Sequence, residues 1–436
     1  MDRRSYLHIL EEQIRMKRAR AMAVREVEDH IEDQKAAFLA EGMTEEEAEE
    51  AAVLEMGDPV EAGVALDRIH RPQMAWSVLA GVLLMSILGL ALQMLVVMTA
   101  APQTDTRVFS VMAYFGAAKH IAAIGAGIVL MLLICWMDYS FLAKHAASLW
   151  GLLHVLFILY MLTGSTVNGR PRYAAQLSCM FVPFYAGVLY HFRGQGKKGL
   201  LKSGACLIVP LCLLFYSKLL SSVAVTGICG LILLHVSIKE GWFGAEKRSL
   251  YLRLWAGIFA TAFLILGVHM AAAGGEILAD YQLERIERWI HPGKYEEYDM
   301  LRLMTVEAGE EAREGTALLE ENVLSAVRNS YLWLYLFKYL GTARGMLLTA
   351  FVICFFALLF YTVHRQKNRL GYMVGLGCAL FLSMQTVIYI GINFRLLPFT
   401  TAYMPFLSNG GAYLLISYFY MGILLSVCRN SRLVKN

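Results

Sequence analysis

The segment from about residue 273 to residue 345 carries side chains that could do chemistry. A carboxylate can act as a general base or position a cation, and the guanidinium of Arg288 can grip a phosphate with two parallel hydrogen bonds. Acids on an exposed amphipathic helix are more often simply solvated, and Arg288 could equally extend to lipid headgroups. Both interpretations stay open. The acids are Glu296, Glu297, Asp299, Glu307, Glu310 and Glu311.

The chain that must position these residues has the composition of a membrane protein. Of its 436 residues 58% are hydrophobic and 17% charged, which is too much apolar surface for soluble domains alone. Apolar runs of about 20 residues predict spanning helices rather than barrel strands. We expect an all-α polytopic fold of about ten spans, near Trp76–Thr99, Ile121–Met137, Ala146–Gly164, Ala175–His191, Ala205–Tyr216, Leu219–Ile238, Leu252–Ala272, Met346–Val363, Gly371–Phe394 and Ala412–Cys428.

Basic residues predict the orientation of these spans. One set of loops and the C-terminal tail hold Lys144, Arg193, Lys197, Lys198, Lys202, Lys239, Lys247, Arg248, Arg365, Lys367, Arg369, Arg429, Arg432 and Lys435. The short loops on the opposite side hold only Arg107, Arg170, Arg172, Lys218 and Arg395. Lysine and arginine favour the inner side, so we expect a multi-pass protein of the bacterial cytoplasmic membrane with both termini cytoplasmic. The net charge of +4 and the scattered cysteines indicate no nucleic-acid partner and no metal site.

Residues 1–72 form a predicted cytoplasmic helical domain ahead of a membrane domain at residues 73–436. This prefix is rich in Glu, Arg and Ala, and its apolar residues repeat at helical spacing. We expect a bundle of four short helices. The residues that gather on one face are Val24, Val27, Ile31 and Phe38.

Capping chemistry predicts where these helices begin and end. Gly42 can end one helix, and Thr44 with Glu47 makes a capping box for the next. Asp58 precedes Pro59, which suits the first position of another helix. The MGDP turn that ends in Pro59 resembles that of the permease-prefix domain, which implies a docking or signalling module.

The segment 273–345 is too long for a turn and is predicted to lie outside the membrane. Its WIHPGKYEEYD stretch, from Trp289, has turn signals, and Thr316–Leu340 has an amphipathic helical pattern. We expect interfacial helices on the outer leaflet. Two polar residues inside spans, His154 and His269, could mark a lipid path, although a satisfied hydrogen bond between helices is the commoner role.

The stretch LLPFTTAYMPFLSNGGAYLLISYFYMGILLSVCR, Leu396–Arg429, resembles the C-terminal signature of the SEDS (shape, elongation, division, sporulation) family, the FtsW/RodA/SpoVE group. Prolines and paired glycines at membrane depth free backbone groups, which only protein or water can then satisfy. We therefore expect a re-entrant, cavity-lining loop. The residues that match the signature are Pro398, Pro405, Ser408, Gly410 and Gly411, while Asn409 and Ala412 depart from it.

Weaker agreement extends over residues 76–436, including Asp138-Tyr139, and it implies a role in cell-wall biogenesis. The family polymerises the lipid-linked precursor lipid II into glycan strands, beside a class B penicillin-binding protein with transpeptidase activity. The resemblance implies substrate-binding roles for Arg288, Gln176, Ser178, Pro405, Ser408, Gly410 and Gly411. Partners would be lipid II or a related polyprenyl-linked substrate, the penicillin-binding protein and membrane lipids.

The family's essential aspartate falls at Ser330 in this sequence, within NSYLWLYLFKYLG from Asn329. Glycosyl transfer needs a base for the attacking hydroxyl, or a carboxylate that positions a cation on the leaving group, and serine alone does neither. Asp299 is the substitute that we single out among the acids. No cofactor is required, except that a carboxylate could use a divalent cation. Leu177 and Cys179 also interrupt a family motif.

Three functions therefore remain open. The first is a divergent lipid II polymerase in division, elongation or sporulation. The second is a catalytically inactive scaffold or regulator of a penicillin-binding protein, which Ser330 favours. The third is a lipid-linked precursor transporter. The sequence shows neither an inverted repeat nor a row of intramembrane charges that would support this function.

Overall fold

The computed structural model describes residues 1–70, 74–99, 106–167, 170–171, 173–272, 280–291, 327–400, 402–409 and 411–430. The chain divides into two compact units. The first is Met1–Met74 with the end of the chain from Cys428, and the second is Ala75–Val427.

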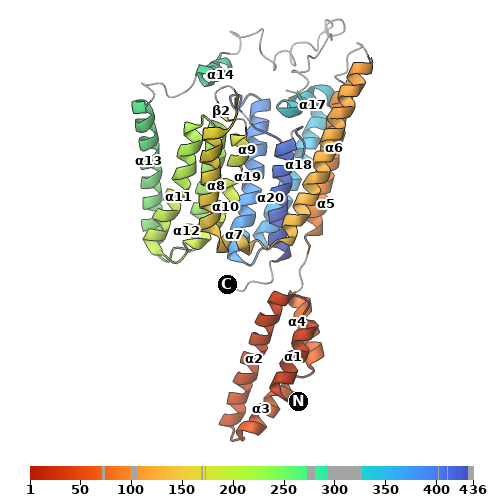
Figure 1. Ribbon diagram of the computed structural model, residues 1–436, viewed down its shortest axis with the longest axis vertical. Helices are drawn as coiled ribbons and strands as arrows, with labels where there is room; N and C mark the ends of the chain where they lie inside the picture. The colour runs from red at the N-terminus through yellow and green to blue at the C-terminus, as the bar shows by residue number, and fades with distance from the viewer. Residues whose placement is uncertain are drawn as a thin grey trace. The chain divides into compact units, whose positions relative to one another are not determined.

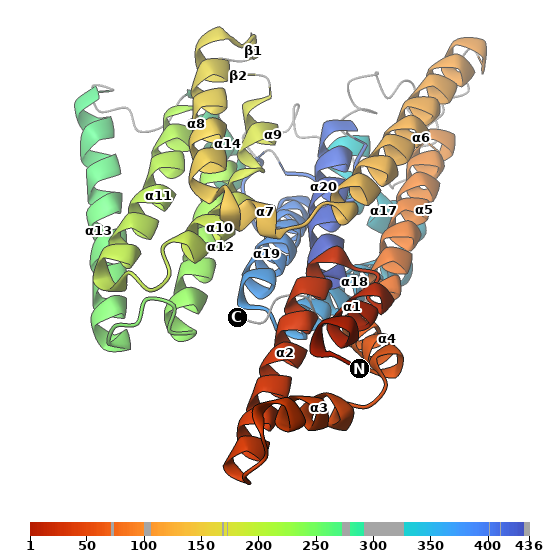
Figure 2. The same cartoon turned by 60° about the horizontal axis from the view of Figure 1, so that its bottom comes forward.

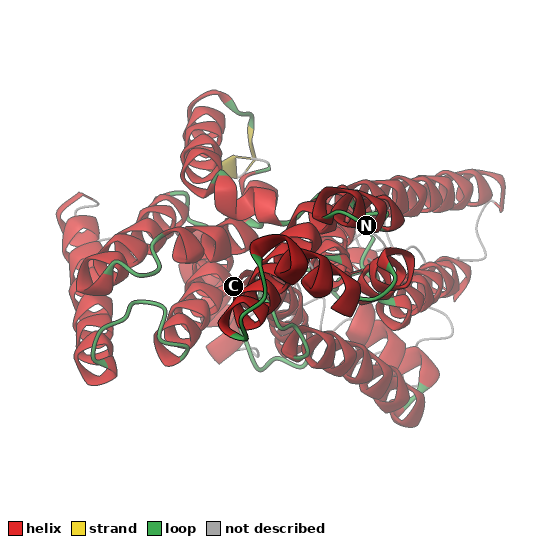
Figure 3. Cartoon of the chain, turned by 90° about the horizontal axis from the view of Figure 1, so that it is seen from below, coloured by secondary structure: helices red, strands yellow, loops and turns green. Residues whose placement is uncertain are grey.

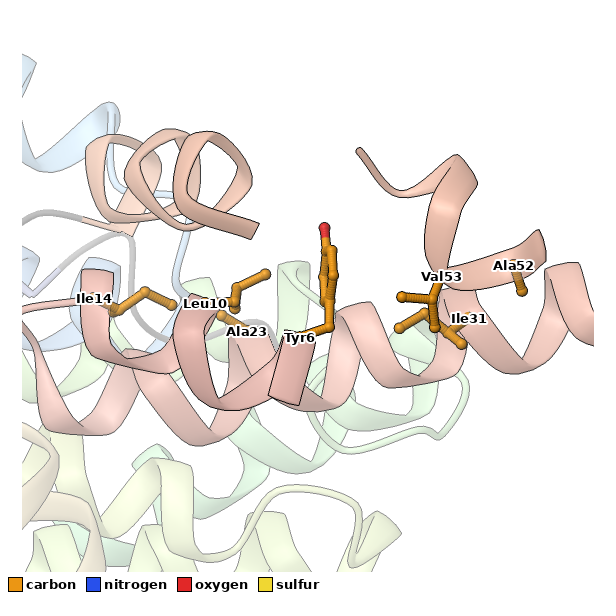
Figure 4. Close-up of a cluster of buried hydrophobic side chains, with 7 residues drawn as sticks. All are labelled: Tyr6, Leu10, Ile14, Ala23, Ile31, Ala52 and Val53. Carbon is orange, nitrogen blue, oxygen red and sulfur yellow. The ribbon is translucent and has the colours of Figure 1, made fainter. Parts of the chain in front are cut away.

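The first unit contains four helices around an apolar core of its own. They are α1 (Arg3–Gln13), α2 (Lys17–Ala40), α3 (Glu45–Glu55) and α4 (Pro59–His70). The core is small, and Figure 4 shows Tyr6 between Leu10 on one side and Ile31 with Val53 on the other. The Tyr6 hydroxyl donates a hydrogen bond to the Met56 carbonyl at 3.1 Å, which ties α1 to the turn before α4.

The predicted caps are confirmed in this unit. Gly42 follows α2 with φ +98°, and Thr44 and Glu47 form the reciprocal capping box of α3. The Asp58 carboxylate accepts from the Val60 amide at 2.9 Å, with Pro59 as the first residue of α4. The expectation of four short helices is wrong for α2, which runs 24 residues because its apolar positions continue on one face for its whole length.

The second unit is built almost entirely from helices (Figures 1 and 3). The all-α polytopic fold is confirmed. Among the described residues it also contains two short antiparallel strands of two residues each, β1 (Thr166–Val167) and β2 (Arg170–Pro171). Its helices are α5 (Trp76–Thr99), α6 (Thr106–Trp136), α7 (Ser140–Lys144), α8 (Ala146–Thr163), α9 (Ala174–Ser178), α10 (Phe181–His191), α11 (Gly196–Tyr216), α12 (Leu220–Lys239), α13 (Lys247–Ala272), α14 (Asp280–Ile290), α17 (Leu332–Leu340), α18 (Thr342–His364), α19 (Arg369–Asn393) and α20 (Gly411–Arg429).

Each of the ten predicted spans falls on helical residues. Among the described residues, 8 helices are long and apolar enough to cross a membrane: α5, α6, α8, α11, α12, α18, α19 and α20. The other two predicted spans correspond to α13 and to the pair α9 and α10. In Figure 2 the short α7 connects the end of α6 to α8.

The second unit has two ends along the direction of its spans. The end that holds the C-terminus of α5, Thr99, is called the far face below.

The prediction of one continuous span over Ala175–His191 is wrong. The chain breaks after Ser178, where the Cys179 and Met180 amides bond three residues back instead of four. Pro183 has no amide hydrogen for the Cys179 carbonyl, four residues earlier. The Tyr420 hydroxyl of α20 donates to that carbonyl instead, so a break in one helix is satisfied by its neighbour.

On the far face, α14 is the amphipathic helix of the predicted outer segment. Figure 1 shows it lying across the direction of the spans. The Trp289 indole donates to the Arg395 carbonyl at 2.8 Å, and the Gln282 amide donates to the Lys218 carbonyl at 3.2 Å. These bonds attach α14 to two separate turns of the far face. Residues 292–326, including most of WIHPGKYEEYD and the start of Thr316–Leu340, lie outside the described residues.

Replacing Thr44 by Ala is expected to loosen α3 by about 1 kcal/mol, because an N-cap hydroxyl is lost. In hydrogen–deuterium exchange of the whole protein, amides in the first turn of α3 should then exchange several-fold faster. Thr44→Ser keeps the cap and should leave the rates unchanged. Equal rates in the alanine variant would show that the capping box contributes nothing to α3.

Candidate functional site

A buried arginine joins three distant parts of the far face. The Arg328 Nε donates to the Gln93 side-chain oxygen at 3.0 Å, while the Gln93 amide donates to the carbonyls of Arg328 and Leu407 at 3.0 and 2.8 Å. The Asn409 amide also bonds the Arg328 carbonyl, at 3.1 Å. Burial lowers the pKa of Arg328 from its ordinary value, yet a guanidinium remains charged. This clamp connects α5, the segment before α17 and the segment before α20.

Residues 402–409 run as irregular backbone and are mostly buried, as expected for a loop in this stretch; that the loop is re-entrant and lines a cavity stays a prediction. Phe406 takes a left-handed φ of +65°. The Ser408 hydroxyl accepts from the Met404 amide at 2.8 Å and donates to the Asn329 carbonyl at 3.1 Å. Side chains of the protein therefore satisfy backbone groups that no helix satisfies here.

A second clamp holds the backbone on both sides of Ser330. The Asn393 amide donates to the Ser330 carbonyl at 2.9 Å, and its oxygen accepts from the Leu334 amide at 3.0 Å. The Tyr389 hydroxyl accepts from the Leu332 amide at 3.0 Å. Because both clamping residues come from the last turns of α19, the start of α17 has a fixed position.

Ser330 itself is half-buried between these clamps. Within the described part of the chain its hydroxyl has no hydrogen-bonded base, and no three His, Cys, Asp or Glu side chains are grouped as a metal site. This position can orient a substrate hydroxyl but cannot remove its proton.

The other predicted site residues lie at different places on the second unit. The Ser178 hydroxyl, in α9, donates to the Ala175 carbonyl at 2.6 Å and lies 3.0 Å from the Ser222 hydroxyl, from which it can accept, while the side-chain oxygen of Gln176 is buried without a partner. Arg288, on α14, is exposed and paired with Glu284 at 2.5 Å.

The structure brings Pro405 and Ser408 into the irregular segment beside Arg328, and Gly411 begins α20 with open space around its α-carbon. Gly410, Asp299 and the acids Glu296, Glu297, Glu307, Glu310 and Glu311 lie outside the described residues. Their predicted roles therefore stay predictions.

Sequence reasoning did not single out the polar residues that build the clamps. Gln93 interrupts an apolar span, and that signal could have found it, because polar groups inside spans are costly and usually functional. Asn393 ends a span and gave a weaker signal. For His154, which was singled out, the ring Nδ1 lies 2.7 Å from the Trp150 carbonyl of its own helix, so the expected bond between helices is wrong. The His269 side chain lies outside the described residues.

Comparison with known proteins identifies the family. Residues 79–433 match the model of the FtsW/RodA/SpoVE family, described as cell cycle protein. The chain belongs to this family. It is 25% identical over 215 residues to a putative peptidoglycan glycosyltransferase FtsW from Mesostigma viride, with 47% of this chain and 48% of that protein covered. A probable FtsW from Coxiella burnetii is 23% identical over 382 residues, with 81% of this chain and 96% of that protein covered.

The chain thus spans about half the length of the first curated relatives that it matches and nearly the whole of a third. Solved structures agree on the fold. A chain of a peptidoglycan synthase complex has a TM-score of 0.58 at 18% identity, with 82% of this chain and 98% of that chain covered. The rod shape determining protein RodA of Thermus thermophilus has a TM-score of 0.51 at 18% identity, with 80% and 96% covered.

Replacing Asn393 by Ala removes three hydrogen bonds at once and leaves buried backbone groups unpaired. The expected cost is roughly 2 kcal/mol or more, seen as a lower unfolding temperature in detergent micelles. The matched control is Gln195→Ala, which removes one bond from an exposed side chain and should change little. Equal unfolding temperatures for the Asn393 variant and the native protein would contradict the second clamp.

Proposed function

We propose that the chain serves peptidoglycan biogenesis, in division, shape or sporulation, as a divergent glycosyltransferase that polymerises lipid II. The observation that carries this proposal is that the family match covers the whole membrane unit, including the clamped segment around Ser330. The names of the relatives support the reaction. A class B penicillin-binding protein is the proposed partner, in keeping with the synthase complex whose chain has this fold.

The proposed location is the bacterial cytoplasmic membrane with both termini cytoplasmic. The distribution of basic residues supports this orientation, since lysine and arginine favour the inner side. It would place the far face, with Arg328, Ser330 and α14, on the outside, where glycan strands are made. The prefix would then be positioned to receive a cytoplasmic signal.

A second candidate is an inactive scaffold that recruits a penicillin-binding protein. The observation that favours it is the serine at position 330, whose hydroxyl has no base among the described residues. The clamps would still hold the backbone around Ser330 in place in such a protein. The two candidates differ only in whether a proton acceptor reaches the attacking sugar hydroxyl.

The deciding experiment measures glycan strands formed from labelled lipid II by the purified protein, with and without a divalent cation. We expect Ser330→Asp to raise the rate by at least tenfold over the native protein, because general-base catalysis contributes about 10² to 10⁴. The matched control is Ser330→Asn, which has the shape of aspartate but no charge and should give no increase.

Polymer from the native protein would contradict the scaffold and direct alanine substitutions to the acids from Glu296 to Glu311. Activity only in Ser330→Asp would mean that the substrate groove survives and the carboxylate is lost. No polymer from either, with the folded protein and its penicillin-binding protein present, would contradict the polymerase.

A further inference from the structure

We propose that Arg328 and His120 form a buried anion site on the far face that takes a phosphate group carried by a lipid. The two side chains come from the segment before α17 and from α6, and the charge of Arg328 acts on the His120 ring. The lipid source of the phosphate rests on the proposed function, whereas the anion site itself rests on the contacts that follow.

Both side chains are buried, and each has a nitrogen atom without a hydrogen-bond partner. Arg328 is 8% exposed and His120 2%, and the Arg328 Nη2 and the His120 Nε2 have no hydrogen-bond partner. Among the described residues, Arg328 makes no ion pair. A buried charge without a counter-charge costs several kcal/mol, so a protein that keeps one has a use for it. An acceptor with negative charge would satisfy the Arg328 Nη2, and the His120 Nε2 as well once that nitrogen carries a proton.

Gly116 makes room for the guanidinium. A β-carbon at this position would lie 2.9 Å from the Arg328 Nη1, closer than real side chains allow. Gly116 and His120 are four residues apart in α6 and therefore share one helical face. The Nη1, the Nη2 and the His120 ring thus gather at one place, which lies within a helical turn of the exposed Lys119.

The positions of the remaining bonds leave the site ready for an acceptor. Gln93 occupies only the Nε of Arg328, so the two Nη groups keep their fork geometry. The His120 side chain is bonded to that of Asn409, which orients the ring. Guanidinium forks match the oxygens of phosphate, and the His120 Nε2 adds a further donor once the ring is protonated, which a neighbouring phosphate favours. Phosphate, having several acceptor oxygens, fits this donor set better than a single carboxylate.

Binding of prenyl pyrophosphate to the whole protein in detergent micelles tests the site. Farnesyl pyrophosphate, farnesol and inorganic pyrophosphate serve as probes, with the dissociation constant measured by calorimetry. We expect farnesyl pyrophosphate to bind and farnesol not to bind. Arg328→Gln should weaken binding roughly tenfold to hundredfold, the range for a lost charge-assisted bond. The control is Arg344→Gln, an exposed arginine of α18 outside the site, which should bind as the native protein does.

Two further variants keep the test decisive if Arg328→Gln fails to fold. Gly116→Ala pushes against the Nη1 and His120→Gln removes the ring, while both retain the arginine, so each should weaken binding several-fold. Native affinity in the folded Arg328 variant, or in both other variants, would overturn the proposal. So would the absence of binding by the native protein, or binding of farnesol as tight as that of its pyrophosphate.

Inorganic pyrophosphate separates the two sources of the anion. Weaker binding than that of farnesyl pyrophosphate supports the lipid, and equal binding would overturn the lipid as its source. A parallel assay of glycan strands keeps the two proposals apart. Arg328-dependent binding without polymer would uphold the anion site and contradict the polymerase. Polymer made equally well by Arg328→Gln would uphold the polymerase and contradict the anion site.

Discussion

The membrane unit depends on one buried contact, between the guanidinium of Arg328 and the side chain of Gln93. A charge at this depth is tolerated only if protein groups replace its water, because desolvation costs several kcal/mol. Here the side-chain oxygen of Gln93 accepts a hydrogen bond from the Arg328 Nε at 3.0 Å, and the Gln93 amide nitrogen donates to the Arg328 and Leu407 carbonyls. One amide side chain therefore connects α5 to two segments that lie 235 and 314 residues further along the sequence.

The same rule explains the irregular parts of the far face. Where backbone leaves a helix inside the membrane unit, a side chain from another element takes the freed group: Ser408 for Asn329, Asn393 for Ser330, and Tyr420 for Cys179. This arrangement gives the 328–334 segment one defined position without a regular helix at Ser330. A surface that binds a lipid headgroup needs that kind of fixed backbone, whether or not it carries a catalytic carboxylate.

Most of the fold was predictable because its signals are local. Apolar runs located the 8 described helices that are long and apolar enough to cross a membrane, and Thr44 with Glu47 located the start of α3. The break before α10 was not predicted, since it depends on Pro183 and on a hydroxyl from α20, about 240 residues away. The clamps were missed for the same reason: Gln93 and Arg328 look like isolated polar residues until the fold brings them together. The resemblance pointed to Ser330, but only the structure shows how Asn393 and Tyr389 hold its neighbourhood.

The most direct test of this account is a double-mutant cycle on Gln93→Leu and Arg328→Met, with the free energy of unfolding measured in detergent micelles. Because the two side chains bond each other and leave a buried group unpaired when one is lost, the account predicts a coupling of roughly 1–3 kcal/mol. Effects that add to within about 0.5 kcal/mol would contradict it, since they would mean that the arginine and the glutamine act independently.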